Sequence, residues 1–166
     1  MPPFRDLWVN GRRAIRARAP NDGYYRIAAA GTDKRTSFTA EPKDITPIAN
    51  PTTAEVVYFH DWSISRVGVK SIDSDKHTYQ LVGPIGANSP FFAICGFEQH
   101  PRYFVENAIE LLDAPGEWFF DAAKRELHYM PREGETIEKL EAIAPRLSQL
   151  VVLRGTDQKS VENVRF

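Results

Sequence analysis

A group of acidic side chains in the second half of the sequence could carry out acid–base chemistry: Glu106, Glu110, Asp113, Glu117 and Asp121. Two carboxylates can cleave a glycosidic bond when they lie ~5–5.5 Å apart, with retention, or ~6.5–9.5 Å apart, with inversion. Glu106 and Glu110 are four residues apart and would share one face of a helix. Because paired surface acids more often form a solvated face, this spacing does not by itself predict catalysis. Glu106 is kept as a candidate substrate contact.

Tryptophan side chains offer flat apolar surfaces on which a sugar ring can stack. The sequence has three of them, Trp8, Trp62 and Trp118. Large aromatic side chains in a β-rich domain usually pack in the core, and we expect this for Trp8 and Trp118. Trp62 stands beside Asp61 and close to Arg66 in a polar stretch, which favours an exposed binding platform.

The sequence lacks the spacings typical of metal and nucleophile sites. The four histidines are scattered, without His-x-His or Cys-x-x-Cys spacing, and the acidic turn 73–75 is too short for a calcium loop. Cys95 lies in an apolar stretch, which favours a buried and unreactive thiol, and as the single cysteine it forms no intrachain disulfide. No nucleophile elbow or phosphate-binding glycine loop is present. We therefore expect neither a metal nor a cofactor.

Four arginines, at positions 12, 13, 16 and 18, form a basic run near the N-terminus. Such a run can indicate an anion or nucleic-acid site. Strand alternation places Arg12, Arg16 and Arg18 on one face, which favours a solvated hairpin face in which Arg16 or Arg18 pairs with an acid. The balance of 21 basic and 22 acidic residues also gives no reason to expect a nucleic-acid partner.

The composition is that of a globular domain of ordinary size, with 166 residues, of which 42% are hydrophobic and 26% charged. No apolar run approaches the ~20 residues of a membrane helix. Residues 1–6 contain no apolar signal core, so the chain as written carries no signal peptide; that expectation lapses if it is part of a longer secreted protein.

The predicted elements are mostly short strands. Asn10–Gly11 predicts a tight hairpin within 7–18. Residues 31–53 read as a long irregular loop. Helical spacing of apolar residues predicts one short helix over 103–112. Strands are expected at 55–59, 63–72, 78–82, 118–120, 127–130, 147–153 and 161–166, and residues 91–97 as a buried strand or a loop that plugs a core. This pattern predicts a mainly β fold, a β-sandwich-like packing of antiparallel strands with one short helix.

Several segments together resemble bacterial right-handed parallel β-helix glycoside hydrolases. They occur in the same order through most of the chain: residues 7–13, 16–21, 62–66, 103–118, 127–131, 134–135, 144–151 and 161–166. The run Glu106–Trp118 is the most specific of them.

The resemblance implies the β-rich domain that is inserted into, or precedes, the solenoid of such enzymes. It implies that residues 1–145 form an accessory domain, and that 146–166 lead into a β-helix that lies outside this chain and bears the catalytic acids. Fucosidase, xylosidase and xylanase activities occur among relatives, so plant-type glycans are the expected ligands, and the parent protein is expected to be secreted or periplasmic. The candidate sugar contacts are Trp62, Arg66, Glu106 and Asn107, with Trp118 as a weaker fifth.

Two other interpretations stay open at this point. The chain could be a free-standing carbohydrate-binding or structural module without catalysis, or a small complete hydrolase whose acids converge in a pocket. The alternation in Val161–Phe166 leaves an unpaired strand edge, so we also expect the isolated chain to self-associate.

Overall fold

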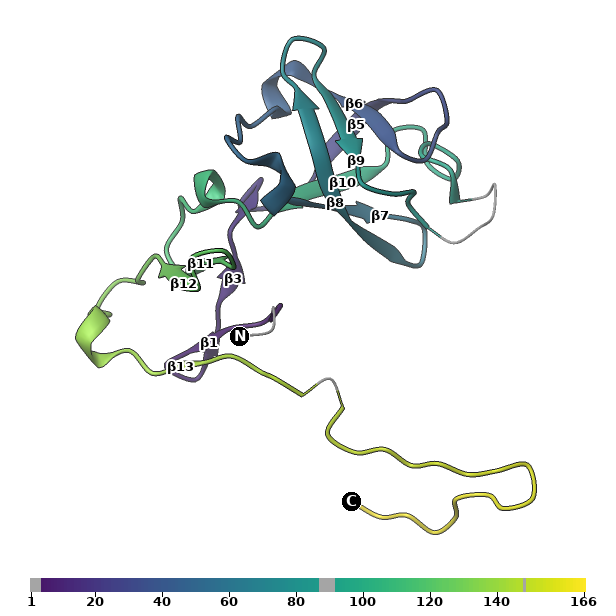
Figure 1. The fold of residues 1–166 in the computed structure, drawn as a ribbon, viewed down its shortest axis with the longest axis vertical. Coiled ribbons are helices and arrows are strands. Elements are labelled where there is room, and N and C mark those ends of the chain that lie inside the picture. Colours follow the sequence, from purple (N-terminus) through teal and green to yellow (C-terminus); the bar gives the residue numbers. More distant parts are fainter. Residues whose placement is uncertain (1–3, 87–91, 148) are drawn as a thin grey trace.

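Six strands close into a barrel in the computed structural model, which describes residues 4–86, 92–147 and 149–166 (Figure 1). In order around the barrel they are β5 (Tyr25–Ala30), β6 (Ser37–Ala40), β9 (Thr78–Leu81), β8 (Ile64–Asp73), β7 (Glu55–Phe59) and β10 (Arg102–Glu106). Closure occurs at β10, where Tyr103 pairs with Tyr25 on one side and Tyr58 on the other. The prediction of a mainly β fold is confirmed. The predicted two-sheet sandwich is replaced by a barrel. The ring closes because β10 pairs with both β5 and β7, the two ends of the series β5-β6-β9-β8-β7.

Alternation along the barrel strands sends one set of side chains inward. Phe38, Tyr79 and Tyr103 form the aromatic centre of the interior, with ring centroids 4.9–6.2 Å apart, and all three are buried. Valine and isoleucine residues from β5, β7, β8 and β10 complete the core around these rings. The neighbouring residues on the same strands therefore face outward, and they include Glu55, Phe104 and Glu106.

The N-terminal segment, residues 4–19, contributes strands to three sheets, two strands to one sheet and one strand to each of the other two. β1 (Trp8–Val9) and β2 (Arg12–Arg13) form the predicted hairpin, with Asn10 and Gly11 at φ values of 50° and 72°. β3 (Ile15–Arg16) pairs in parallel with β11 (Glu117–Asp121), and β4 (Arg18–Ala19) pairs with β10. The positive φ angles are those that an Asn-Gly turn favours.

Two small sheets lie beside the barrel (Figure 1). One contains β3, β11 and β12 (Glu126–Tyr129), and the other contains β2, β1 and β13 (Ala142–Ile143). They enclose a second apolar core made of Leu7, Val9, Ala14 and Trp118, against which Phe4 stacks with its ring 5.1 Å from that of Trp118. This core holds the N-terminal segment next to the outer wall of the barrel.

The helix predicted over 103–112 is wrong. Its first residues form β10, Asn107 has a φ of 68°, and only the single 3-10 turn η4 (Ile109–Leu111) follows. The aromatic and β-branched residues Tyr103, Phe104 and Val105 favour a strand, and the left-handed backbone of Asn107 ends it. The i, i+4 face that Glu106 and Glu110 would share is therefore absent.

The other predicted elements are partly confirmed. Strands appear at or within one residue of the predicted positions 55–59, 63–72, 78–82, 118–120 and 127–130. The supposed loop 31–53 contains β6 and two 3-10 turns, η1 (Pro42–Asp44) and η2 (Pro51–Thr53). Residues 92–97 form a loop with Ile94 buried against the barrel core, and Phe91 lies outside the described residues.

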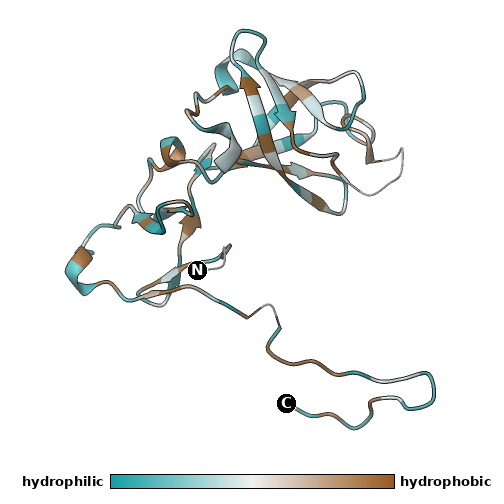
Figure 2. Cartoon of the chain, in the orientation of Figure 1, coloured by the Kyte–Doolittle hydropathy of each residue, from teal (hydrophilic) through white to brown (hydrophobic). Residues whose placement is uncertain are grey.

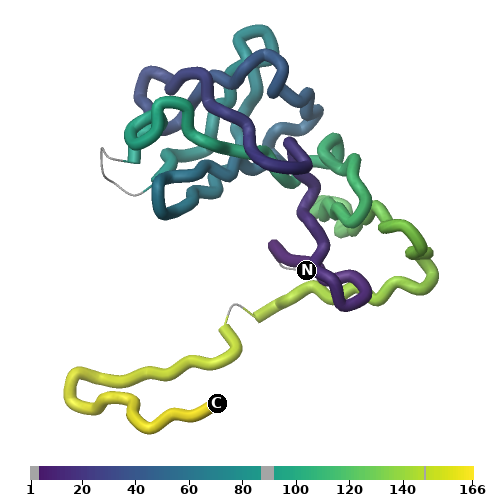
Figure 3. Tube along the Cα trace, turned by 180° about the vertical axis from the view of Figure 1, so that it is seen from behind, coloured from purple at the N-terminus to yellow at the C-terminus, as the bar shows by residue number. Residues whose placement is uncertain are grey.

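The C-terminal segment extends away from the sheets as a tail of residues 145–166 (Figures 1 and 3). Its described residues form no strand, so the strands predicted at 147–153 and 161–166 are wrong; one bridge joins Thr156 to Lys159. Apolar side chains along the tail are exposed: Leu147, Leu150, Val151, Val152, Leu153, Val161, Val164 and Phe166. Figure 2 colours several stretches of the tail as hydrophobic. No strand of the described residues 4–86, 92–147 and 149–166 pairs with the tail, and alternation alone cannot stabilise it.

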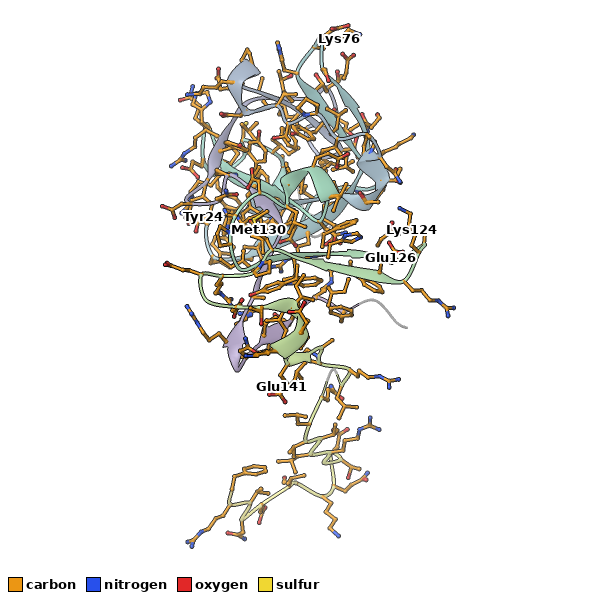
Figure 4. All side chains as sticks on the ribbon, turned by 90° about the vertical axis from the view of Figure 1, so that its left-hand side faces the viewer. Tyr24, Lys76, Lys124, Glu126, Met130 and Glu141 are labelled. Atoms are coloured by element: carbon orange, nitrogen blue, oxygen red, sulfur yellow. The ribbon has the colours of Figure 1, made fainter. Side chains whose placement is uncertain are left out.

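In Figure 4 the tail side chains, below the labelled Glu141, project to both sides of the backbone. The short 3-10 turn η5 (Ile137–Lys139) and β13 are the last regular elements before it. The predicted boundary at 145/146 stays a prediction. Within the described part of the chain, no helix is long and apolar enough to cross a bilayer.

Candidate functional site

Two glutamates face each other on the outer wall of the barrel. Glu55 on β7 and Glu106 on β10 are register partners, and both side chains point away from the core. Like charges directly opposite each other in a sheet repel and destabilise the pair. A cation between them is therefore required, and the N-terminal segment supplies it.

Arg16 on β3 connects the two carboxylates. Its Nη1 atom donates to Glu55 Oε2 at 2.5 Å and to Glu106 Oε1 at 3.0 Å, and its Nε atom donates to Asn107 Oδ1 at 3.1 Å. The two acceptor oxygens are thus no more than about 5.5 Å apart. The expectation that Arg16 or Arg18 pairs with an acid is confirmed for Arg16.

Two further arginines flank this centre. Arg5 makes a two-pronged contact with Glu55, Nη1 to Oε2 and Nη2 to Oε1, both at 2.8 Å. The Arg66 Nε atom lies 3.4 Å from Glu106 Oε1. Arg66 reaches the same surface because it pairs with Val57 on β7, one strand from β10. The outer wall therefore holds an alternating set of positive and negative groups.

Asn107 and Trp118 support Arg16 from two sides. The Asn107 amide donates to the carbonyl oxygen of Thr53 at 2.6 Å while its own oxygen accepts from Arg16, so it ties the end of β10 to η2. The Trp118 ring is buried, with its centroid 6.0 Å from the Arg16 guanidinium carbon. This confirms the expected core position of Trp118, which limits it to a role behind the site.

A pocket of about 410 Å³ opens over this network, between the N-terminal segment and the barrel wall. Its lining consists of Arg5, Asp6, Arg13, Ala14, Ile15, Arg16, Arg18, Arg66, Phe104 and Glu106. Arg18 covers the Phe104 ring, with its guanidinium carbon 3.8 Å from the ring centroid. A pocket of this volume accommodates a sugar unit.

The pKa of Glu55 does not suit an acid catalyst. Burial raises the pKa of Glu55, but hydrogen bonds and charge from Arg5 and Arg16 outweigh it and hold that pKa below its ordinary value. A general acid needs the opposite shift, so that it keeps its proton at neutral pH. The separation of Glu55 and Glu106 is compatible with that of a retaining pair, but their arginine partners keep Glu55 ionised.

The remaining predicted acids are each held by a local structural contact. Glu110 accepts from the backbone nitrogen of Ala49 at 2.9 Å, and Asp113 accepts from the Asn21 amide at 2.8 Å. Asp121 accepts from two backbone nitrogens in the β11–β12 turn. None of these contacts brings them to the pocket.

Glu117 is the most deeply buried acid of the predicted set. It accepts hydrogen bonds from the backbone nitrogens of Arg18, Asp113 and Ala114 at 3.1–3.3 Å. Burial raises its pKa, and those hydrogen bonds only partly offset the effect. Its carboxylate joins β4 to the 113–117 turn, so it positions the segment that bears Arg16 and Arg18.

Trp62 lies in a second cluster, on the loop between β7 and β8. Its side chain is 71% exposed, and its ring contacts Phe97 and Phe92 with centroids 5.2 and 6.3 Å away. A pocket of about 280 Å³ adjoins this loop, lined in part by Asp61 and Phe97. The predicted exposure of Trp62 is confirmed, whereas Trp8 is 41% exposed rather than buried.

Of the five predicted contacts, Arg66, Glu106 and Asn107 come together around Arg16, Trp118 lies behind that centre, and Trp62 belongs to the other cluster. Reasoning from the sequence missed Glu55 and Arg5 as members of the site. Their positions follow from strand register and from the path of the N-terminal segment. No group of three potential metal ligands occurs among residues 4–86, 92–147 and 149–166.

Comparisons with known proteins bear on this arrangement. The model of a family described as the GH141 insertion domain matches residues 1–132. A solved structure titled "Glycoside hydrolase" superimposes with a TM-score of 0.73 at 26% sequence identity, over 96% of this chain and 29% of that chain. The chain thus spans under a third of that structure's length. A search of curated proteins finds no match.

Proposed function

Since the chain belongs to the GH141 insertion domain family, we propose that it is an accessory, non-catalytic β domain of a glycoside hydrolase. In this proposal the domain shapes one wall of the substrate cleft of an enzyme that degrades polysaccharides or oligosaccharides. Membership of an insertion-domain family is the observation that carries the proposal. Plant-type glycans are the proposed ligands.

The positions of the acids support a role without catalysis. Glu55 and Glu106 are neutralised by arginines, and Glu117 is buried among backbone donors. A glycosidase needs one carboxyl that donates a proton and a second that attacks or activates water. Neither role is open to carboxylates that serve as structural acceptors, so we propose that the reacting acids belong to another part of the enzyme.

The tail is the proposed connection to that part. Its exposed leucine and valine side chains would pack against further structure of the same protein, which we propose to be a parallel β-helix that continues from residues 146–166. Contiguous exposed apolar surface is typical of such contacts. A parent enzyme of this kind would act outside the cytoplasm, in the periplasm or after secretion.

A second candidate function is that of a stand-alone carbohydrate-binding module. The exposed Trp62 ring with Phe97 beside it favours this alternative, because aromatic rings at a surface suit the apolar face of a sugar. The two candidates differ in whether the domain alters the chemistry of a linked catalytic part.

The experiment compares the 166-residue chain with a form joined to the catalytic part of a glycoside hydrolase of this family, on aryl glycosides and plant oligosaccharides. We expect no turnover by the chain alone, and turnover by the joined form with a KM that falls when the domain is present. Turnover by the 166 residues alone would overturn the proposal. An unchanged KM, together with glycan binding by the free chain, would favour the stand-alone module.

A further inference from the structure

The pocket on the barrel wall has a surplus of positive charge in a chain that is otherwise nearly balanced. Five guanidinium groups line it, whereas the carboxylates that line or contact it are Asp6, Glu55 and Glu106. The whole sequence has 21 basic and 22 acidic residues. The surplus is therefore local to this pocket, which favours a negatively charged ligand.

The arginines fall into two groups by what they already bind. Arg5 and Arg16 are committed to Glu55 and Glu106 and hold the N-terminal segment on the barrel. Arg66 has one ionic contact among the described residues, through Nε, and its side chain is 41% exposed. Both of its Nη nitrogens are therefore free of acceptors within the described part of the chain.

Arg13 and Arg18 also keep donor capacity. Arg13 contacts Asp6 through Nη2, and its side chain is 67% exposed. Arg18 donates to the carbonyl oxygens of Pro20 and Gly23 at 2.9 and 2.6 Å, and no carboxylate among the described residues forms an ion pair with it. Burial lowers the pKa of Arg18, and the charges of Glu106, Glu117 and Asp22 only partly offset that loss of hydration.

The pocket offers little to a neutral sugar by comparison. Its one aromatic lining residue, Phe104, is buried beneath the Arg18 guanidinium, so its face is not available for stacking. Two exposed aromatic rings, Trp62 and Phe97, lie together in the Trp62 cluster instead. Arginine forks match the planar geometry of carboxylates and the oxygens of sulfate groups.

We propose that this pocket binds the anionic group of an acidic sugar unit, a uronate carboxylate or a sulfate ester, through Arg13, Arg18 and Arg66. The proposal rests on the accessory carbohydrate-contacting function proposed above and names the class of sugar. The pocket volume of about 410 Å³ suits one sugar unit of a longer chain. The ion pairs of Arg5 and Arg16 keep the pocket in shape without any ligand.

The test titrates the 166-residue chain, labelled for heteronuclear NMR, with three matched methyl glycosides: glucuronate, glucose 6-sulfate and glucose. We expect saturable shifts of arginine Nε–Hε signals with one or both of the charged sugars and none with glucose. Binding by glucuronate alone assigns a carboxylate, and binding by the sulfate alone assigns a sulfate ester. Raising the salt concentration should weaken binding, since the contacts are ionic.

Two substitutions on β8 distinguish binding through the pocket from a nonspecific effect of the net positive charge. Arg66→Gln should weaken binding of the charged sugar about tenfold, because it removes the positive charge and the two Nη groups that are proposed to donate to the anion. Lys70→Gln removes an equal charge from β8 at an exposed position outside the pocket lining, and should leave affinity unchanged. Matching circular dichroism spectra will establish that both variants fold.

Three outcomes would overturn the inference. Equal binding of glucose, insensitive to Arg66→Gln, removes the charge preference but leaves the accessory carbohydrate role standing. Equal binding of acetate or inorganic sulfate makes the pocket a simple ion site. Absence of binding by all three sugars also rejects it, and the effect of the joined domain on KM then decides the accessory role independently.

Discussion

Replacing Arg16 by an uncharged side chain of similar length should lower the stability of the domain substantially. Arg16→Met keeps a side chain of similar length but leaves Glu55 and Glu106 opposite each other without the shared cation. Removing one partner of a buried ion pair typically costs about 3–5 kcal/mol of unfolding free energy. The three side chains are 14%, 18% and 9% exposed.

The loss of unfolding free energy in Arg16→Met should be smaller than this range, because the three side chains are partly exposed and other ion pairs remain. Arg5 still binds Glu55 and Arg66 still lies near Glu106, so we expect a loss of about 2–3 kcal/mol. For a domain of this size that loss lowers the melting temperature by about 4–12 °C. Urea and thermal unfolding, followed by circular dichroism and tryptophan fluorescence, measure both quantities.

A double-mutant cycle isolates the cause. Glu106→Gln removes one of the two facing charges, so the pair Arg16→Met with Glu106→Gln should cost at least about 1 kcal/mol less than the sum of the single variants. Arg13→Met is the control, because its ion pair with Asp6 is exposed and should be worth under about 0.5 kcal/mol. Equal losses for Arg16→Met and Arg13→Met, or an additive cycle, would refute the reasoning.

Two further predictions concern acid stability and association. The pKa of Glu55 is raised by burial and lowered more strongly by Arg5 and Arg16, so its folded pKa lies below the unfolded value of about 4.5; the stability it contributes is present above that pH and is lost as the pH falls through the folded pKa. Glu55→Gln should therefore flatten the fall in urea midpoint between pH 5 and pH 3, and an unchanged slope counts against it. Removal of residues 145–166 should abolish self-association at high concentration in light scattering, because it deletes the exposed apolar tail; persistent oligomers would locate the contact elsewhere.

Local signals in the sequence predicted those elements that neighbouring residues determine. Asn10–Gly11 has the positive φ angles of its turn, and alternation over 63–72 predicted the strand that the structure has at 64–73. The pairing of Arg16 with an acid was also predictable, because a cation on a strand face next to a folded core usually meets one. These features require no knowledge of which strands are neighbours.

Long-range pairing determines the features that were missed. The apolar residues of 103–112 fit helical spacing as well as they fit a strand, and only the partners on both edges of β10 decide between them. The opposition of Glu55 and Glu106 depends on register, and a shift by one residue would send one side chain inward. The cluster around Arg16 thus contains three residues that the sequence singled out, Arg66, Glu106 and Asn107, and two that it did not, Glu55 and Arg5; their contact with a sugar stays a prediction.

The path of the N-terminal segment also constrains when the domain can form during translation. Trp8 of β1 pairs with Ile143, Ile15 of β3 pairs with Glu117, and Ala19 of β4 pairs with Val105. Each of these N-terminal strands therefore leaves the ribosome roughly a hundred residues before its partner. At about 5–20 residues per second, that delay is of the order of 5–30 seconds. β3 and β4, which bear Arg16 and Arg18, must remain without these partners throughout it, and the pocket on the barrel wall is consequently among the last features to be assembled.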